Sequence, residues 1–336
     1  MWQVTGHDWV VGVLNSSIAE ERVSHAYLLT GPPGVGKSTL ALNMAQALLC
    51  EQPDKPCGNC EPCRKTMEGI HPDVRIVDLR YQARLREESP HEQNELRIDT
   101  IRSITQEAGL KPFEARRRVL LIPDAETMTS QAANALLKTL EEPPDHIVLL
   151  LTTADPRLLL PTIVSRCQVL GLRLVPIKLI EEELQLRHGV DAARSNLLAR
   201  LSGGRIGWAI SAARDSSMLQ HREDTLRELA ALPRSGRIDR LDYAARLTRS
   251  PSGIRETLEL WLTWWRDLLL ITGGSPETIG NVDAAEPLEQ EAHRYDLRAI
   301  FMFLKAIRRT QRQLEMNADP RLALEVLMLE LPARSD

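Results

Sequence analysis

The sequence predicts an α/β domain built on a parallel sheet, followed by an all-α carboxyl-terminal half. From Val23 to about Arg173, short apolar runs rich in β-branched residues alternate with amphipathic segments long enough to form helices. This alternation is typical of strand-helix-strand units, which form parallel sheets. After Arg173 the strand signals stop, and leucine-rich and arginine-rich stretches with helical spacing continue. The chain of 336 residues is long enough for two or three domains.

Four apolar runs are predicted as central strands, because they are continuous rather than alternating, as in strands that are covered on both faces. These runs are Ala26–Thr30, Val74–Leu79, Arg118–Ile122 and His146–Thr153. Helical patterns follow the first strand over Thr39–Leu49 and the third strand from Gln131 until Pro143 ends the helix. The charged segment Leu85–Leu96 is predicted to be a solvated loop, and we assign no role to the insertion 80–96 that contains it.

Breaks in the helical pattern divide the second half of the chain. The glycine-containing breaks are Gly203–Gly204, Ser235–Arg237 and Gly273–Glu289. We place domain boundaries near residues 173 and 217. The segment Trp261–Leu270 holds three of the six tryptophans on one predicted helix. We expect these side chains in a domain core rather than at an interface, although either environment would bury them.

Composition and charge exclude several classes of protein. The 42 Lys and Arg residues face 46 Asp and Glu residues, a net charge of -4, which is not the strongly basic balance of an autonomous nucleic-acid binder. The longest apolar runs, such as Ile147–Leu151 and Leu268–Ile271, are far shorter than the roughly 20 residues of a membrane-spanning helix. The first ten residues lack the basic start and apolar stretch of a secretory signal. We therefore expect a cytoplasmic protein whose thiols stay reduced.

A phosphate-binding loop follows the first predicted strand. Residues 31–38 match G-x-x-x-x-G-K-[ST] directly between that strand and a helical pattern, the context that the motif requires. Backbone N–H groups and the helix N-terminus would hold the phosphates, Lys37 would reach the β and γ phosphates, and Ser38 would ligate Mg²⁺. The alternative is a glycine-rich turn that binds nothing. The predicted contacts to ATP or ADP are Gly31, Pro32, Pro33, Gly34, Val35, Gly36, Lys37, Ser38 and Thr39.

The third predicted strand ends without the acidic residue that nucleotide hydrolysis requires at this place. A working NTPase holds Mg²⁺ and positions water with an acidic residue after its second motif strand. Here that strand is followed by Pro123-Asp124-Ala125-Glu126, and a proline side chain cannot coordinate a cation. Asp124 or Glu126 would have to substitute from a different spacing. We therefore expect nucleotide binding without efficient hydrolysis by this chain.

Four of the five cysteines have the spacing of a metal site. Cys50, Cys57, Cys60 and Cys63 form C-x6-C-x2-C-x2-C, and only Cys167 stands apart. Four thiolates suit tetrahedral Zn²⁺, and a full set of four sulfurs leaves no open position for catalysis, so the predicted zinc is structural. The alternatives are a disulfide pair, which a reducing cytoplasm disfavours, and a redox C-x-x-C, which the two extra cysteines disfavour.

Four stretches of the chain together carry a family resemblance. They are His25–Ala41, Cys57–Cys63, Gln131–Pro144 and Leu159–Gln168. These stretches resemble bacterial clamp-loader subunits of DNA polymerase III over residues 1 to about 215, and more weakly beyond. The resemblance implies a AAA+ P-loop module with a zinc loop over residues 1–173, a helical lid over 174–216, and an all-α collar domain over 217–336 through which subunits assemble.

Within that family, three departures favour the delta-prime type over the ATP-hydrolysing gamma/tau type. Pro123-Asp124 stands in place of the gamma-type Asp-Glu pair. In the segment Ser202–Ala209, Ile206 stands where gamma-type chains carry an arginine that senses the γ phosphate, although Arg205 is adjacent. Tau also continues far beyond a collar, whereas this chain stops. The intact phosphate loop is the contrary observation, because some delta-prime chains have lost theirs.

The resemblance also implies a role for one arginine. Arg166, in Ser165-Arg166-Cys167, lies where the family places an arginine finger that acts on the nucleotide of the adjacent subunit. The alternative is an ion pair with a local carboxylate. The implied function is a stator in a hetero-pentamer with gamma/tau and delta subunits, which loads a sliding clamp onto primed DNA. The chain itself is then expected to contact DNA weakly. The competing interpretation is a gamma/tau-type ATPase in which Asp124 takes the magnesium role.

Overall fold

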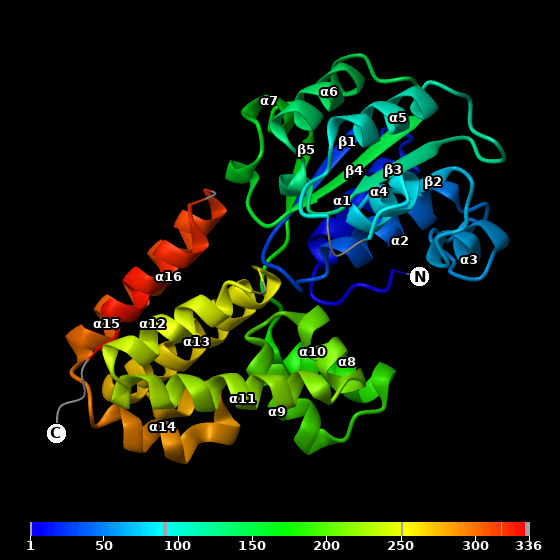
Figure 1. Cartoon of the computed structure of the whole chain (residues 1–336). Coiled ribbons are helices and arrows are strands. Elements are labelled where there is room, and N and C mark those ends of the chain that lie inside the picture. The colour runs from blue at the N-terminus through cyan, green and yellow to red at the C-terminus, as the bar shows by residue number, and fades with distance from the viewer. Residues whose placement is uncertain (1, 90–92, 250, 317, 333–336) are drawn as a thin grey trace. The chain divides into compact units, whose positions relative to one another are not determined.

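Five parallel strands form one sheet in the order β2-β3-β4-β1-β5 (Figure 1). The bounds of the strands are β1 Ala26–Thr30, β2 Val74–Ile76, β3 Arg118–Ile122, β4 Ile147–Thr153 and β5 Gln168–Gly171. The four predicted strands are confirmed, although β2 ends three residues early because the chain turns there into a helix. The fifth strand was not predicted, and it pairs with β1 at the edge of the sheet.

Helices cover both faces of this sheet, which explains the continuous apolar runs in its central strands. One face packs against α1 (Asp8–Ala19) and α2 (Lys37–Leu49). The other face packs against α5 (Ile98–Ala108), α6 (Ser130–Glu141) and α7 (Pro161–Val164). Neighbouring side chains of one strand point to opposite faces. In β1, Leu28 packs on the face that α5, α6 and α7 cover, and Leu29 packs on the face that α1 and α2 cover.

The predicted solvated loop Leu85–Leu96 is largely confirmed, since most of its described residues are exposed and most lie outside helices. Its first two residues instead end the helix α4 (Leu79–Arg86), and its last residue, Leu96, is fully buried. Gln82 of α4 is also fully buried. Its amide donates to Gln93 Oε1 (2.7 Å) and Glu95 O (2.9 Å), and accepts from the Arg97 N–H (2.7 Å) and Thr100 Oγ1 (2.8 Å). This amide fastens the insertion to α5. Residues 90–92 of the predicted loop lie outside the described residues.

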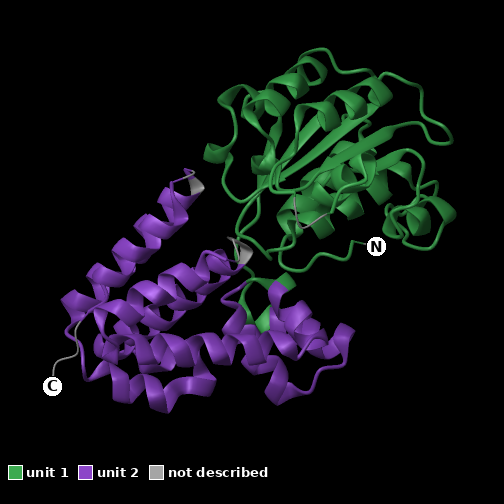
Figure 2. Ribbon diagram, viewed as in Figure 1, with its two compact units in different colours: residues 1–179, 205–207 green, residues 180–204, 208–336 purple. Residues whose placement is uncertain are grey.

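The computed structural model describes residues 2–89, 93–249, 251–316 and 318–332. The chain divides into two units, 1–179 with 205–207, and 180–204 with 208–336 (Figure 2). The three-part division at residues 173 and 217 stays a prediction.

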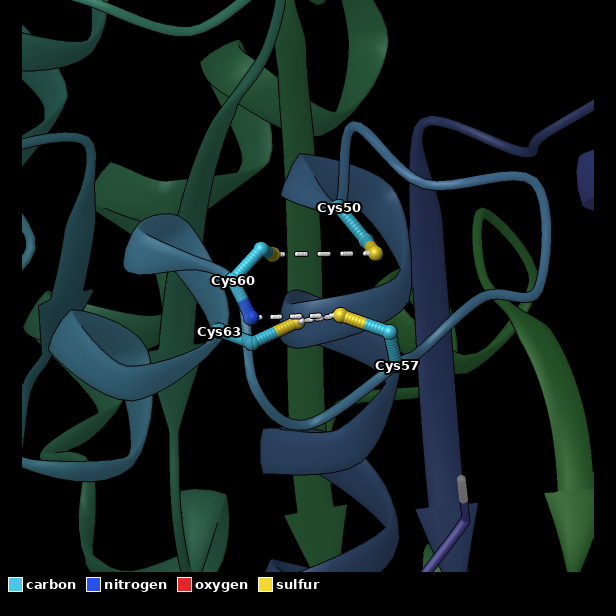
Figure 3. Close-up of side chains that lie close together, drawn as sticks. All are labelled: Cys50, Cys57, Cys60 and Cys63. Carbon is cyan, nitrogen blue, oxygen red and sulfur yellow. Dashed lines mark hydrogen bonds between the residues drawn. The ribbon is translucent and has the colours of Figure 1, made fainter.

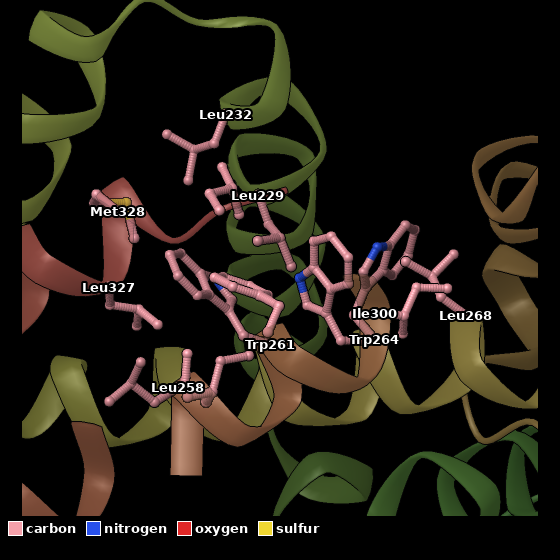
Figure 4. Close-up of a cluster of buried hydrophobic side chains, with 14 of the residues drawn as sticks. Leu229, Leu232, Leu258, Trp261, Trp264, Leu268, Ile300, Leu327 and Met328 are labelled. Carbon is pink, nitrogen blue, oxygen red and sulfur yellow. The ribbon is translucent and has the colours of Figure 1, made fainter. Parts of the chain in front are cut away.

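The chain after β5 is helical, as predicted. The helices are α8 Ile177–His188, α9 Ala192–Ser202, α10 Ile206–Arg214, α11 Ser217–Ala231, α12 Arg237–Leu247, α13 Pro251–Thr272, α14 Ala285–Ala292, α15 Leu297–Glu315 and α16 Pro320–Leu329. The tryptophans Trp261, Trp264 and Trp265 of α13 are all buried in the core that α11 to α16 form, which confirms the expected core position. Figure 4 shows Trp261 and Trp264 in this core. The Trp265 ring meets Phe303 of α15 edge to face, with 4.7 Å between the ring centroids.

Candidate phosphate-binding loop and metal centre

The predicted phosphate loop joins β1 to α2 at the carboxyl end of the sheet, where parallel α/β sheets bind ligands. Gly31 opens the loop with a φ of +143°, and a Cβ at this position would lie 2.5 Å from the Leu172 carbonyl oxygen. Only glycine fits this backbone. Lys37 begins α2, and the hydroxyl-bearing Ser38 and Thr39 in its first turn are exposed. A helix N-terminus with a lysine and two accessible hydroxyls is the donor set that a nucleotide phosphate requires.

Contacts from the rest of the first unit hold this loop in shape. The buried Lys37 ammonium donates to the carbonyls of Gly31 (2.6 Å) and Pro32 (3.1 Å). The Gly207 N–H, at the start of α10, donates to the Gly34 carbonyl (2.7 Å). The ring of His7, which is 1% exposed, contacts the Val35 carbonyl through Nε2 (3.0 Å). Four carbonyl groups of the loop, those of residues 31, 32, 34 and 35, therefore have hydrogen-bond partners within the chain.

Sequence reasoning missed the contacts of His7 and Gly207 with the loop. Both residues are far from the loop along the chain, and neither belongs to a motif that names its partner. A Cβ on Gly207 would lie 2.9 Å from the Gly34 carbonyl oxygen, so glycine permits the close approach. Arg205 and Ile206, the two residues compared with the gamma-type arginine, precede this contact and belong to the first unit.

The segment after β3 begins with the proline that, in the prediction, replaces a magnesium-binding acid. Pro123 directly follows Ile122, the last residue of the strand. Asp124 is exposed with a left-handed φ of +46°, and its N–H donates to Thr152 Oγ1 at the end of β4 (3.0 Å). Glu126 Oε1 accepts the Ala154 N–H (3.0 Å), while its Oε2 is buried without a hydrogen-bond partner among the described residues.

The four predicted metal ligands come together at the end of α2. Cys50 caps α2, Cys57 and Cys60 lie in the loop that follows, and Cys63 belongs to α3 (Glu61–Met67) (Figure 3). Their four Sγ atoms all lie within 4.8 Å of one another. The separation is 3.9 Å between the sulfurs of Cys57 and Cys63 and 3.8 Å between those of Cys50 and Cys60. With Zn–S bonds of about 2.3 Å, a tetrahedral site has sulfurs about 3.8 Å apart. The cluster could thus hold a metal ion of this kind.

The electrostatic environment differs among these thiols. Backbone N–H groups of Cys60 (3.3 Å) and Asn59 (3.4 Å) point at the Cys57 sulfur and lower the pKa of this thiol to about 6. Burial raises the pKa values of the Cys50 and Cys63 thiols instead. A bound cation would favour the thiolate form of all four, because metal binding releases thiol protons.

Arg166 lies between α7 and β5, outside the phosphate loop of its own chain. Its guanidinium pairs with Glu141 at the end of α6 (NH2 to Oε1, 2.7 Å) and donates to the Thr162 carbonyl (3.0 Å). About a third of the side chain, 35%, stays exposed. The structure thus contains the local ion pair that was the alternative to a finger, and the arginine finger stays a prediction.

The parallel sheet with a loop of the P-loop pattern after β1 defines an α/β module of the P-loop type, and helices make up the chain that follows. Two family models match the chain. DNA polymerase III, delta subunit, matches residues 6–176, and DNA polymerase III, delta subunit, C terminal, matches residues 216–332. The chain belongs to the DNA polymerase III delta subunit family.

Relatives include both delta-prime and tau subunits. The chain is 27% identical to DNA polymerase III subunit delta' of Bacillus subtilis, over 96% of this chain and 95% of the relative. It is 41% identical to subunit delta' of Pseudomonas aeruginosa, over 43% of this chain and 42% of the relative. It is also 32% identical to subunit tau of Escherichia coli over 62% of this chain, which spans only 31% of that relative.

Within the part of the chain that the structure describes, no helix combines the length and the apolar composition needed to cross a membrane.

Proposed function

We propose that this chain is a delta-prime-type subunit of a DNA polymerase III clamp loader. It binds ATP or ADP with Mg²⁺ in the loop 31–39, and it hydrolyses the nucleotide slowly or not at all. Arg166 leaves Glu141 on assembly and stabilises charge on the nucleotide of a neighbouring gamma/tau subunit, an effect worth roughly 10³ to 10⁵ in rate. The four cysteines hold a structural zinc ion. The complex, which also contains a delta subunit, loads a sliding clamp onto primed DNA in the cytoplasm.

The observation that carries this proposal is a glycine-rich loop of the phosphate-binding pattern after β1, together with Pro123 directly after β3. The loop has the donors for binding, with Lys37 and the α2 N-terminus in place. The acid that would hold Mg²⁺ directly after β3 is replaced by a side chain without a ligand atom. The loop therefore retains the groups for nucleotide binding, while the replacement at Pro123 removes an acid that nucleotide hydrolysis requires.

Two measurements on the purified full-length chain test this separation. We expect saturable binding of a fluorescent ATP analogue, lost in Lys37→Ala and retained in Lys138→Ala, which removes an exposed lysine of the same unit. We expect ATP turnover at the background rate. Brisk turnover by the isolated chain would instead establish the gamma/tau-type interpretation. The intact loop favours that second candidate, with Asp124 as the magnesium-binding acid, and turnover should then be lost in Asp124→Asn.

A further inference from the structure

Two buried amide side chains on α2 connect the metal cluster to the amino-terminal segment. The Gln46 amide donates to the Cys63 carbonyl (2.8 Å), and its oxygen accepts from the Asn43 amide (3.0 Å). Asn43 in turn accepts the backbone N–H of Gln3 (2.6 Å). Asn43 is fully buried and Gln46 is 2% exposed. A buried amide that loses its partner costs about 1 to 3 kcal/mol, so these groups hold their positions strongly.

The same amino-terminal segment reaches the phosphate loop four residues later. His7 contacts the Val35 carbonyl, and the Cβ that Gly36 lacks would lie 4.0 Å from the same ring nitrogen. The helix α2 provides a second connection, since Lys37 begins it and Cys50 caps its end. Thirteen residues at about 1.5 Å per residue separate the two sites by roughly 20 Å.

We propose that this set of contacts, from Cys63 through Gln46, Asn43 and Gln3 to His7 and Val35, couples the metal site to the phosphate loop. We name it the α2 relay. Gln46 and His7 are its positioning residues. A metal ion fixes Cys63, and the relay then holds the loop in the conformation that receives phosphate. Metal binding and nucleotide binding therefore strengthen each other. The proposal rests on the proposed function, because it requires that the loop binds nucleotide.

Reciprocity makes the coupling measurable from either site, since each ligand must change the affinity of the other by the same factor. The full-length chain loaded with Zn²⁺ is titrated with a chromogenic zinc chelator, with and without a saturating non-hydrolysable ATP analogue. We expect the analogue to tighten zinc binding about 5-fold to 20-fold, within the usual range for coupled sites. The affinity for a fluorescent ATP analogue, measured with and without zinc, should change by the same factor.

Variants separate the relay from general damage to the helix. Gln46→Met keeps the side-chain length and removes both hydrogen bonds, and His7→Phe removes the contact with the loop. Each is expected to lower the coupling factor to about 1 while the chain still binds one zinc ion. Met44→Leu changes a fully buried apolar side chain of the same helix and serves as the matched control, with its coupling factor unchanged. The double variant should lose no more coupling than either single one.

Three results would overturn the relay. One is a coupling factor of 1 in the unaltered chain that binds both ligands, and another is unchanged coupling in Gln46→Met and His7→Phe. A chain that binds zinc but no nucleotide would also overturn it, and this result alone would in addition refute the nucleotide binding in the proposed function. Because the chelator titration produces the metal-free chain, circular dichroism of that chain is recorded alongside, so that unfolding on metal loss is distinguished from coupling through the relay.

Discussion

At the scale of single residues, we propose that one proline separates this chain from a hydrolytic P-loop protein. Pro123 follows β3 at the place where Mg²⁺ is normally held. Glu126 accepts a backbone N–H at the end of β4, and Asp124 is exposed. Pro123 is visible in the sequence because it is a single residue in a recognisable context, and its effect on hydrolysis stays a prediction.

A buried carboxylate, Asp73, fixes the loop that leads into β3. It is fully buried and accepts the N–H groups of Phe113 (2.6 Å), Glu114 (2.9 Å) and Ala115 (2.9 Å). Burial by itself would raise the pKa of Asp73. The three donors and the nearby Arg118 guanidinium outweigh it, so that the pKa is lowered. Nothing in the sequence marks this role, because the donors lie about 40 residues further along the chain.

The lowered pKa of Asp73 predicts a dependence of stability on acid. A carboxyl group whose pKa is lower in the folded state contributes stability that is complete above its unfolded pKa, about 3.9. This contribution is lost as the pH falls through the folded pKa. Asp73→Asn should lower the free energy of unfolding by about 1 to 3 kcal/mol at pH 7, and the difference from the unaltered chain should shrink below pH 4.

Urea denaturation of both chains between pH 7 and pH 3 measures this difference. Asp99→Asn, which changes an exposed carboxylate of α5, is the control and should change the free energy of unfolding little. An Asp73→Asn deficit that stays constant over the whole pH range would contradict the assigned role of the carboxylate.

At the scale of elements, the metal cluster joins the end of α2 to α3. Removing the metal should therefore destabilise the first unit. Zinc at 100 times its dissociation constant stabilises a folded chain by about 2.7 kcal/mol, which corresponds to a Tm change of about 5 to 10 °C for a unit of this size. Thermal denaturation with and without a chelator measures it.

Cysteine variants identify which thiols take part. Cys60→Ser should lose the bound zinc and show the lower Tm without chelator. Cys167→Ser is the matched control and should keep one zinc ion by mass spectrometry, because Cys167 lies outside the cluster. A chain purified with no zinc, and with a Tm that chelator and added Zn²⁺ leave unchanged, would exclude the structural zinc.

The core helix of the second unit yields a prediction of its own. Trp261 of α13 is fully buried and stacks on Tyr243, with ring centroids 5.9 Å apart. Trp261→Ala should cost about 3 to 5 kcal/mol, as large-to-small changes of a buried aromatic side chain do. Trp9→Ala removes a tryptophan that is 52% exposed and should cost far less. Equal losses of unfolding free energy in the two variants would contradict the core position of α13.

Elements were predictable where the signal is local. The four central strands have continuous apolar runs, and the cysteine spacing is a motif in itself. The strand β5 was missed because it is four residues long and half exposed at an edge. The exposed loop after β2 was predicted from its charge, but the buried Gln82 just before it was missed, because its four partners come from residues 93–100. Burial of such polar groups depends on tertiary partners, which composition does not encode.

At the scale of the whole molecule, we propose a subunit that binds nucleotide and acts on the nucleotide of a neighbouring subunit. Membership of the DNA polymerase III delta subunit family covers both units, since its two models match residues 6–176 and 216–332. The proposed collar, the partner subunits and the arginine finger all concern the assembled complex. The decisive evidence for them therefore has to come from that complex.

The most direct test is the ATPase rate of the reconstituted clamp-loader complex with this subunit altered. Arg166→Ala should lower the rate at the adjacent gamma/tau site by about 10³-fold, and Lys37→Ala should leave it nearly unchanged. Arg75→Ala is the matched control, because Arg75 is similarly exposed, also pairs with a glutamate, and lies on β2 at the other edge of the sheet. An ATPase rate abolished by Lys37→Ala and unaffected by Arg166→Ala would contradict the account.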